Sequence, residues 1–440
     1  MAFCSLGCSK NLVDTETMMG LLRSAGMEPA SDRDSADVVF INTCAFIADS
    51  AQESVDTILE FARDRRDGRI GALVVAGCLA QRYGSSLMEE IPEIDALIGT
   101  GDCGRCVEAV QSALRGERPV FIGAPGFLAQ EGGPRVIATP KHLAYLKIAE
   151  GCANRCSYCL IPSLRGPARS RPVEAIVREA RSLASSGVRE LVVIAQDTTA
   201  YGCDLYGRPS LARLLRELAE AAADGIEWIR VMYTYPSLID DELIDVFAGE
   251  ERIVKYLDIP MQHGSDRVLK MMSRRSSRAQ MIQVCGRLRE RVPGLVLRTS
   301  LIVGFPGETD EDFEELLSFI DIVRPERAGV FEFSAEEGTR AYDMPGQVPS
   351  EVAAGRRGIA MEALARISRE FGESRVGSVT RVLVDGPSDE SDLVVEARSY
   401  AEAPEVDGKV YIGDATLEAG EMVDVAITDA GQYDLAADRI

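Results

Sequence analysis

The chain has 440 residues and a formal net charge of −22, with 46% of its residues hydrophobic and only two histidines. This length predicts two or three domains, and the acidity disfavours direct nucleic-acid binding. The apolar runs are too short to cross a membrane and the first residues carry no secretory signal, so we expect a cytoplasmic protein.

Residues 1–115 alternate short apolar runs with amphipathic stretches. The runs predict strands and the stretches predict helices, an alternation typical of an open, mostly parallel α/β sheet. The expected strands are 2–6, 38–42, 72–76 and 96–98, and the expected helices are 11–25, 49–66, 81–91 and 105–114. Residues 116–141 are rich in proline and glycine and are expected to form a linker.

The same alternation resumes at residue 142 and continues to residue 372. Six β–α units in succession predict a partial (β/α)6 barrel, whose chemistry should lie at the carboxyl ends of its strands. The strands are expected at 143–148, 190–195, 229–233, 256–259, 296–303 and 328–333, with helices that include 173–186, 310–323 and 351–371.

Residues 373–440 have a different pattern. Valine-rich runs at 379–384, 393–397 and 422–427, separated by Gly, Pro and Asp, predict a small antiparallel β-barrel. This segment holds sixteen acidic and five basic residues, a net charge of −11. A module that binds RNA should present a basic face, so the acidity favours a basic protein partner. The alternative is an acidic surface kept for solubility.

The eleven cysteines need a role other than disulfides in a reducing compartment. With so few histidines, any metal chemistry must use thiolates, which favour iron–sulfur clusters or zinc. The clearest pattern is Cys152, Cys156 and Cys159, a C-x3-C-x2-C motif directly after the first barrel strand. Three thiolates can bind three irons of a 4Fe-4S cluster and leave the fourth iron open. A structural zinc site is the alternative, but it normally needs a fourth Cys or His nearby.

A second group comprises Cys8, Cys44 and Cys78, each of which directly follows a predicted parallel strand. The carboxyl ends of adjacent parallel strands lie along one edge of a sheet, so these three thiols can meet although they are far apart in sequence. The alternative is three buried small side chains, which is the usual role of a free cysteine.

The motif at Cys152 resembles that of the radical-SAM superfamily. The resemblance implies that the open iron chelates the amino and carboxylate groups of S-adenosylmethionine, with Tyr158 against the cofactor. Gln196, Gln262 and Gly304 end later strands of the expected barrel, where backbone can approach a nucleotide or sugar closely. Each of these strand ends is also compatible with an ordinary turn.

Nearly the whole chain is similar to the methylthiotransferase family, which joins a three-cysteine α/β domain to a radical-SAM barrel and a small TRAM-type β-barrel. The resemblance implies that Cys8, Cys44 and Cys78 hold a second 4Fe-4S cluster that donates sulfur. It also implies S-adenosylmethionine as radical and methyl source, and an electron donor such as a flavodoxin or ferredoxin. No catalytic acid or base is expected, because the reacting C–H bond has no useful acidity.

Within that family, residues 6–11 and 333–339 look like the RimO type, which modifies the basic ribosomal small-subunit protein twelve. Ser9 departs from that type, which usually has proline there. Together with the acidic C-terminal segment, this resemblance implies methylthiolation of an aspartate β-carbon in that protein. The alternatives are a tRNA adenosine methylthiotransferase and a non-catalytic iron–sulfur scaffold.

Four further features are expected to have no role in catalysis. Cys103 and Cys106 form a C-x2-C pair, but no partner pair is visible, so a structural role is favoured. Residues 99–104 match G-x-G-x-x-G, but they follow the last strand of their unit, so we expect no dinucleotide site there. His142 and His263 are expected to make local hydrogen bonds.

Overall fold

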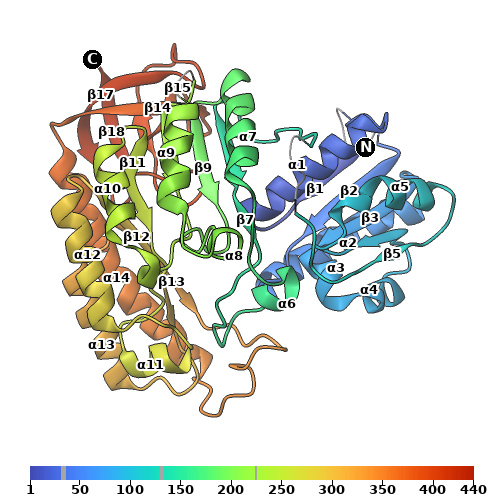
Figure 1. Ribbon diagram of the computed structural model, residues 1–440, viewed down its shortest axis with the longest axis horizontal. Coiled ribbons are helices and arrows are strands. Elements are labelled where there is room, and N and C mark those ends of the chain that lie inside the picture. The colour runs from blue at the N-terminus through green and yellow to red at the C-terminus, as the bar shows by residue number, and fades with distance from the viewer. Residues whose placement is uncertain (31–35, 129–132, 223–224) are drawn as a thin grey trace.

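The computed structural model describes residues 1–30, 36–128, 133–222 and 225–440. An N-terminal parallel sheet, a central six-stranded parallel sheet and a C-terminal closed barrel organise this part of the chain (Figure 1). No helix within these residues is long and apolar enough to span a membrane. The expected fold class, α/β with a small C-terminal β-barrel, is confirmed.

The N-terminal sheet has five parallel strands in sequence order. They are β1 (Ala2–Ser5), β2 (Val38–Thr43), β3 (Ala72–Gly77), β4 (Ala96–Ile98) and β5 (Val120–Phe121). On one face lie α1 (Ser9–Ser24) and α5 (Cys106–Leu114), and on the other lie α2 (Ala48–Arg66), α3 (Cys78–Tyr83) and α4 (Ser85–Glu90). Because both faces are covered, all of β2 and β3 is buried, which explains their largely apolar sequences.

Two details of this unit differ from the sequence prediction. The single helix expected at 81–91 is two helices, because Gly84 takes a φ of 59° and interrupts the helical path. The segment expected to be a linker, 116–141, contributes β5, whose two residues are too short a run to predict. Residues 129–132 of that segment lie outside the described residues.

The central sheet consists of six parallel strands in the order β6-β9-β10-β11-β12-β13. They are β6 (Leu143–Lys147), β9 (Glu190–Ile194), β10 (Trp228–Val231), β11 (Ile253–Asp258), β12 (Val296–Val303) and β13 (Arg327–Glu332). The longer helices are α7 (Val173–Ser185), α9 (Leu211–Ala221), α10 (Asp241–Gly249), α12 (Arg278–Arg291), α13 (Asp310–Val323) and α14 (Ser350–Arg375). Short elements complete the unit: β7 (Ala149–Glu150), α6 (Ile161–Arg165), β8 (Arg169–Ser170), α8 (Cys203–Tyr206) and α11 (Asp266–Met271).

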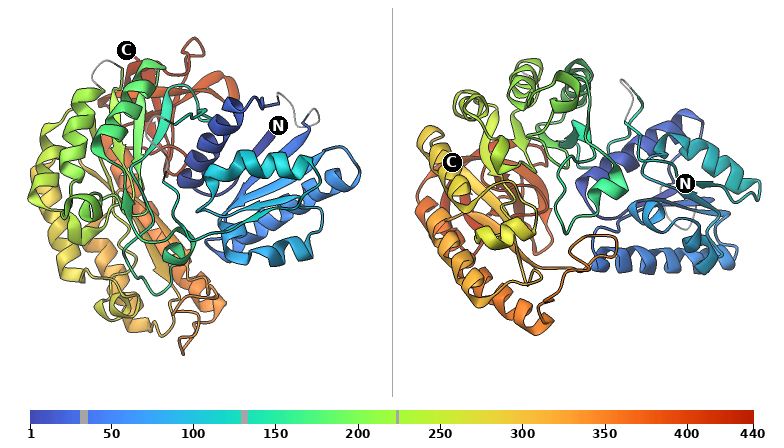
Figure 2. Two further views of the ribbon diagram at one scale, coloured as in Figure 1. Left: turned by 45° about the vertical axis from the view of Figure 1, so that its right-hand side comes forward. Right: turned by 60° about the horizontal axis from the view of Figure 1, so that its bottom comes forward.

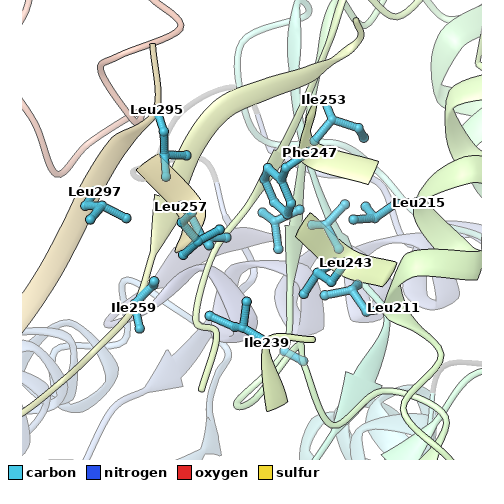
Figure 3. Close-up of a cluster of buried hydrophobic side chains, with 14 of the residues drawn as sticks. Leu211, Leu215, Ile239, Leu243, Phe247, Ile253, Leu257, Ile259, Leu295 and Leu297 are labelled. Atoms are coloured by element: carbon cyan, nitrogen blue, oxygen red, sulfur yellow. The ribbon is translucent and has the colours of Figure 1, made fainter. Parts of the chain in front are cut away.

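The main core lies between these strands and the helices outside them. Figure 3 shows part of it, where Leu211 from α9 and Phe247 from α10 pack with Leu257 from β11. All three side chains are at most 2% exposed. This core holds the strands in place, so the loops at their carboxyl ends start from fixed positions.

The C-terminal unit is a closed barrel in the strand order β14-β15-β16-β18-β17. Its strands are β14 (Val379–Ser388), β15 (Ser391–Ser399), β16 (Val410–Ile412), β17 (Met422–Ala430) and β18 (Leu435–Arg439). The prediction of a purely antiparallel barrel was wrong in one pair, because β16 and β18 run parallel. That pairing closes the barrel, and it depends on two short strands that the valine pattern did not reveal.

The small barrel packs on the amino ends of the central strands. Glu190, the first residue of β9, binds Arg230 at 2.7 Å and Arg398 of β15 at 2.5 Å. Arg327, the first residue of β13, binds Glu402 at 2.7 Å. These ion pairs are buried, and they place the small barrel at the end of the central sheet opposite to the carboxyl ends. The N-terminal sheet lies beside the central unit, with α6 between them (Figure 1 and Figure 2).

Candidate functional site

Two groups of three cysteines flank α6. The first group, Cys152, Cys156 and Cys159, lies on the loop that follows β6 and β7, at the carboxyl end of the central sheet. Gly151 has a φ of 77°, and a Cβ there would lie 2.2 Å from the Pro167 carbonyl oxygen. Only glycine fits this position, where the chain turns from strand to cysteine loop.

Hydrogen bonds to three other elements fix this cysteine loop. Asn154 donates from Nδ2 to Asp197 at the end of β9, over 2.7 Å. Ser157 donates its backbone N–H to the Met272 carbonyl over 2.9 Å, and its own carbonyl accepts from Ala341 N over 2.9 Å. The loop is therefore held by the segments that follow β9, β11 and β13, which is how a barrel assembles a site from distant segments.

The three barrel thiols affect one another electrostatically. Burial raises the pKa of Cys159 to about 12, and the neighbouring Cys156 and Cys152 thiols contribute to that rise. Burial likewise raises the pKa of Cys152 to about 11. As isolated groups, these two thiols stay protonated at neutral pH, and metal binding would have to displace their protons.

The donor set of these thiols fits a cluster better than a single ion. Zinc in structural sites normally takes four Cys or His ligands, and this loop supplies three cysteines. The cysteines of a 4Fe-4S cluster bind separate irons and stand further apart than the ligands of one zinc. The donor set of three thiols without a fourth ligand therefore matches a cluster with one open iron.

The four residues expected at S-adenosylmethionine have different surroundings. Tyr158 packs against Met272 and Phe305, and burial raises its pKa well above the ordinary value. Gln196 donates from Nε2 to Glu150 over 2.6 Å, while its buried Oε1 has no hydrogen-bond partner among the described residues. Such an orphaned acceptor is what a ligand donor group would satisfy.

The other two positions have backbone roles. Gln262 has a φ of 74° and bridges to β12, where its N–H donates to the Ser300 carbonyl over 2.9 Å. Gly304 has a φ of 74°, and a Cβ there would lie 2.5 Å from the Cβ of Ala353 on α14. The need for glycine at 304 thus follows from helix packing. A role for Gly304 at the cofactor stays a prediction.

The second group of cysteines meets at one edge of the N-terminal sheet. Cys8 follows β1 and precedes α1, Cys44 follows β2, and Cys78 follows β3 and begins α3. A Cβ on Gly7 would lie 2.6 Å from the Cβ of Cys44, and a Cβ on Gly77 would lie 2.3 Å from Asn42 Oδ1. Both glycines have positive φ, so they allow the three strand ends to approach closely.

The three thiols of this group affect one another electrostatically. Burial raises the pKa of Cys78 to about 12, and the thiols of Cys8 and Cys44 contribute to that rise, while Arg165 opposes it. Cys8 is the exposed member of the group, whereas Cys44 and Cys78 are buried. Burial would raise the pKa of Cys8, but Lys10 and Arg165 outweigh it and hold that pKa below its ordinary value.

A buried charge network connects the two cysteine groups. Arg165 ends α6, is 3% exposed, and donates from Nη2 to the Cys78 sulfur over 3.6 Å and to the Asn11 side chain. Its Nη1 donates to Asp14 over 2.7 Å and to Glu150 over 3.2 Å.

Lys147 completes the network from β6. It donates to Glu150 over 2.6 Å and also to Asp14, so two cations and two carboxylates neutralise one another. Burial would raise the pKa of Glu150, but Arg165 and Lys147 hold it far below its ordinary value. Glu150 in turn accepts from Gln196, which continues the network to the barrel site.

Sequence analysis did not predict this network. Its members come from α1, β6, β7 and α6, and up to 154 residues separate two that share a hydrogen bond, Asn11 and Arg165. The one available signal was the presence of charged residues in segments whose other residues predict burial. Lys147 ends an apolar strand and Glu150 directly precedes the cysteine motif.

The remaining sequence features lie away from this site. Cys103 and Cys106 are buried in the N-terminal core, and burial raises the pKa of both. His263 accepts from Ser265 N over 2.9 Å, the local hydrogen bond that was expected. His142 instead bonds Asp385 of β14 over 3.1 Å, a contact between two units, so the expectation of a local hydrogen bond was wrong there.

The glycine-rich segment 99–104 also has a packing explanation. A Cβ on Gly99 would lie 2.3 Å from Gln81 Oε1, and a Cβ on Gly101 would lie 2.5 Å from the Ala124 carbonyl oxygen. These glycines let the segment that follows β5 lie close to the end of β4.

Three family models match the chain, one for each of its three structural units. They are the Uncharacterized protein family UPF0004 over residues 1–99, the Radical SAM superfamily over residues 146–320 and the TRAM domain over residues 376–440. The cysteine loop at the carboxyl end of a six-stranded parallel sheet and the second of these matches define a radical-SAM protein.

Curated relatives match over the full length. A protein named ribosomal protein uS12 methylthiotransferase RimO from Pelotomaculum thermopropionicum is 50% identical over 99% of this chain and 98% of its own. The protein of the same name from Geobacter sulfurreducens is 48% identical over 100% of this chain and 98% of its own. The chain therefore belongs to the RimO family of ribosomal protein uS12 methylthiotransferases.

Solved structures support the fold alone. The radical S-adenosylmethionine methyltransferase TsrM from Kitasatospora setae, solved with tryptophan and a SAM analogue, has a TM-score of 0.55 at 15% identity and covers 88% of this chain and 79% of that chain. The cobalamin-dependent enzyme OxsB, solved with aqua-cobalamin and S-adenosylmethionine, has a TM-score of 0.51 at 14% identity and covers 83% of this chain and 56% of that chain.

Proposed function

We propose that this transferase methylthiolates the β-carbon of an aspartate in ribosomal protein uS12, using two 4Fe-4S clusters and S-adenosylmethionine. The observation that carries the proposal is the meeting of Cys8, Cys44 and Cys78 at one sheet edge, beside a radical-SAM cysteine loop. The full-length identity to relatives named for this reaction supports it. When bound, these cofactors supply the electron transfer, hydrogen abstraction and methylthio group that no side chain can supply.

Cys152, Cys156 and Cys159 would hold the first cluster. Tyr158 and the strand ends at Gln196, Gln262 and Gly304 would border S-adenosylmethionine, and the unpartnered Oε1 of Gln196 is available to accept a hydrogen bond from it. Hydrogen bonds from the cysteine loop to the segments that follow β9, β11 and β13 hold the loop in place. An unactivated C–H bond needs no acid–base pair, so the chain's task here is to bind and orient.

Cys8, Cys44 and Cys78 would hold the second cluster, the source of sulfur. Their thiols lie at the carboxyl edge of the N-terminal sheet, against α6 of the central unit. We assign the binding of the second cluster to residues 1–115 and the radical-SAM chemistry to residues 142–372. Residues 373–440 would contact uS12. An electron donor such as a flavodoxin or ferredoxin would reduce the first cluster.

The direct test uses anaerobically reconstituted enzyme, S-adenosylmethionine, a low-potential reductant and purified uS12. We expect about eight irons per chain and a methylthio group on one aspartate of uS12, detected by mass spectrometry. The Cys152→Ala variant should retain about half of the iron and give no product. If uS12 stays unmodified while adenosine in tRNA gains the group, the proposed substrate is wrong. If wild type saturates near four irons, the second cluster is wrong.

A further inference from the structure

Arg165 is a cation that one unit of the protein places inside the cysteine site of another. It belongs to α6, six residues after Cys159 of the barrel motif, yet its guanidinium lies against Cys78 and Asn11 of the N-terminal unit. Residues Leu160 and Leu164 of the same segment are buried in the N-terminal core. The position of Arg165 is therefore fixed by apolar packing as well as by charge.

The partners of Arg165 hold it in one orientation. Nη1 is bound by Asp14 at 2.7 Å and by Glu150 at 3.2 Å, which leaves Nη2 directed to Asn11 and to the Cys78 sulfur at 3.6 Å. A guanidinium is planar and always charged, so fixing one side of the fork fixes the other. Arg165 is thus a cationic side chain that donates directly to a cysteine of this group.

We propose that Arg165 is a positioning residue that sets the reduction potential of the cluster at Cys8, Cys44 and Cys78, through its charge and its hydrogen bond to the Cys78 sulfur. This inference rests on the proposed function, in which those cysteines hold a cluster. Net charge and hydrogen bonds to cysteine sulfurs are two of the levers by which a protein tunes such a cluster. The positive charge of Arg165 and its hydrogen bond to the sulfur both stabilise the more negative, reduced form of the cluster.

The opposing charges of the network predict the direction in which each substitution changes the reduction potential. Replacing Arg165 with glutamine removes the cation and leaves Asp14 and Glu150 with only Lys147, so the site becomes more negative and the potential should fall. Replacing Asp14 with asparagine removes one of the two carboxylates, so the site becomes more positive and the potential should rise. A merely structural role for the network would not produce shifts of opposite sign.

The test uses the full chain with Cys152, Cys156 and Cys159 replaced by alanine, so that only the N-terminal cluster is present. Its reduction potential is measured by a redox titration followed by electron paramagnetic resonance. In this background we expect Arg165→Gln to lower the potential, Asp14→Asn to raise it and Arg165→Lys to fall between wild type and Arg165→Gln. Lysine keeps the charge but cannot hold Asp14 and Cys78 together.

Arg171→Gln is the matched control. Arg171 is also buried, lies six residues after Arg165 and also pairs with a carboxylate, Glu179 at 2.6 Å, but no described contact joins it to a cysteine. The reduction potential of the cluster in Arg171→Gln should equal that in the parent protein.

Each outcome decides one claim. Equal potentials in the Arg165 and Arg171 variants would overturn the inference, as would shifts of the same sign in Arg165→Gln and Asp14→Asn. If Arg165→Gln cannot hold the cluster, the sign of the shift in Asp14→Asn still decides. If the parent triple variant binds no iron, the proposed second cluster fails instead.

Discussion

At the scale of single residues, Cys8 differs from Cys152 in the charges around its thiol. Lys10 and Arg165 hold the pKa of Cys8 below its ordinary value despite burial, whereas burial raises the pKa of Cys152 to about 11. A thiolate is thus favoured at Cys8 before any metal binds, whereas burial raises the pKa of Cys78 in the same group to about 12. The separate tasks proposed for the two groups rest on their positions in different units of the fold.

If the two cysteine groups have separate tasks, methylthio transfer and reductive cleavage of S-adenosylmethionine can be uncoupled. Cys8→Ala should abolish methylthio transfer to uS12 but leave reductive cleavage of S-adenosylmethionine measurable, because that chemistry is assigned to the barrel cysteines. Cys152→Ala should abolish both. The products are 5′-deoxyadenosine, measured by chromatography, and modified uS12, measured by mass spectrometry. Loss of 5′-deoxyadenosine in Cys8→Ala, with the barrel cluster still loaded, would show that the assignment is wrong.

His263 is a residue whose burial makes stability depend on pH. It is 0% exposed, its Nε2 lies 3.7 Å from Glu308 Oε2, and burial lowers its pKa to about 3. In the unfolded chain the imidazole has a pKa of about 6.5. Between these two values only the unfolded state binds the proton, so the free energy of unfolding falls as the pH drops below about 6.5.

We therefore expect His263→Gln to flatten the acid side of the stability profile. The histidine contributes a loss of up to about 1.4 kcal/mol per pH unit between pH 6.5 and 5, which the variant should not show. Thermal unfolding midpoints of both proteins across this range provide the measurement. Buried carboxylates destabilise both proteins alike at lower pH, so the difference between the two profiles isolates His263. Parallel profiles would contradict the prediction.

At the scale of elements, three parallel strands bring Cys8, Cys44 and Cys78 together, and glycine makes the last step possible. Gly7 precedes Cys8 with a φ of 86°, and its missing Cβ leaves room for Cys44. Gly7→Ala should therefore displace Cys8 and remove about half of the bound iron, besides a backbone strain of about 1–2 kcal/mol.

Gly26→Ala controls for the strain alone. Its φ of 82° is nearly the same, but a Cβ there would meet no atom within 4 Å. Iron content measured after reconstitution should be normal in this variant. If both alanine variants retain all their iron, close approach at Gly7 does not shape the cluster site.

Elements with a strong local pattern were predictable from the sequence, whereas contacts between units were not. The strand expected at 296–303 is β12 to the residue, because glycines at 294 and 304 bound a run rich in apolar and β-branched residues. Strands β5, β16 and β18 were missed, because they have two to five residues and depend on neighbours already in place. Tertiary pairing decides such strands, not propensity.

The same limit applies to the candidate site. The order of strands and cysteines was enough to predict that Cys8, Cys44 and Cys78 meet, because parallel strand ends share one edge. Nothing local marks Arg165, whose partners Asn11 and Asp14 lie on another unit. Gly304 shows the opposite case, since a strand-end glycine that suggested a cofactor contact also has a packing reason.

At the scale of the whole molecule, the acidity of the C-terminal barrel is unevenly placed. Part of it faces the central unit, where Glu402 binds Arg327 and Arg375, and Asp407 accepts from Tyr256 over 2.6 Å. These carboxylates are structural and cannot attract a partner. The exposed charge includes the acidic hairpin, defined as Asp389, Glu390 and Asp392 where β14 turns into β15.

The position of the acidic hairpin predicts an effect on association and not on chemistry. The small barrel packs on the amino ends of the central strands, away from the cysteine loop. Changing all three hairpin residues to lysine should slow association with basic uS12 about tenfold at low salt, because long-range attraction becomes repulsion. The effect should shrink as salt rises, since screening shortens the reach of these charges.

Stopped-flow association and single-turnover rates separate binding from the chemical step. The matched control changes three exposed glutamates of α13, Glu311, Glu314 and Glu315, to lysine. It alters the net charge equally, so it measures the effect of total charge, and it should slow association less than the hairpin variant. The rate within the bound complex should be unchanged in both variants, and purified tRNA should compete poorly in all three proteins. If the two variants slow association equally, net charge alone attracts uS12. If tRNA binds tightly while uS12 does not bind at low salt, the acidic hairpin does not dock a basic protein.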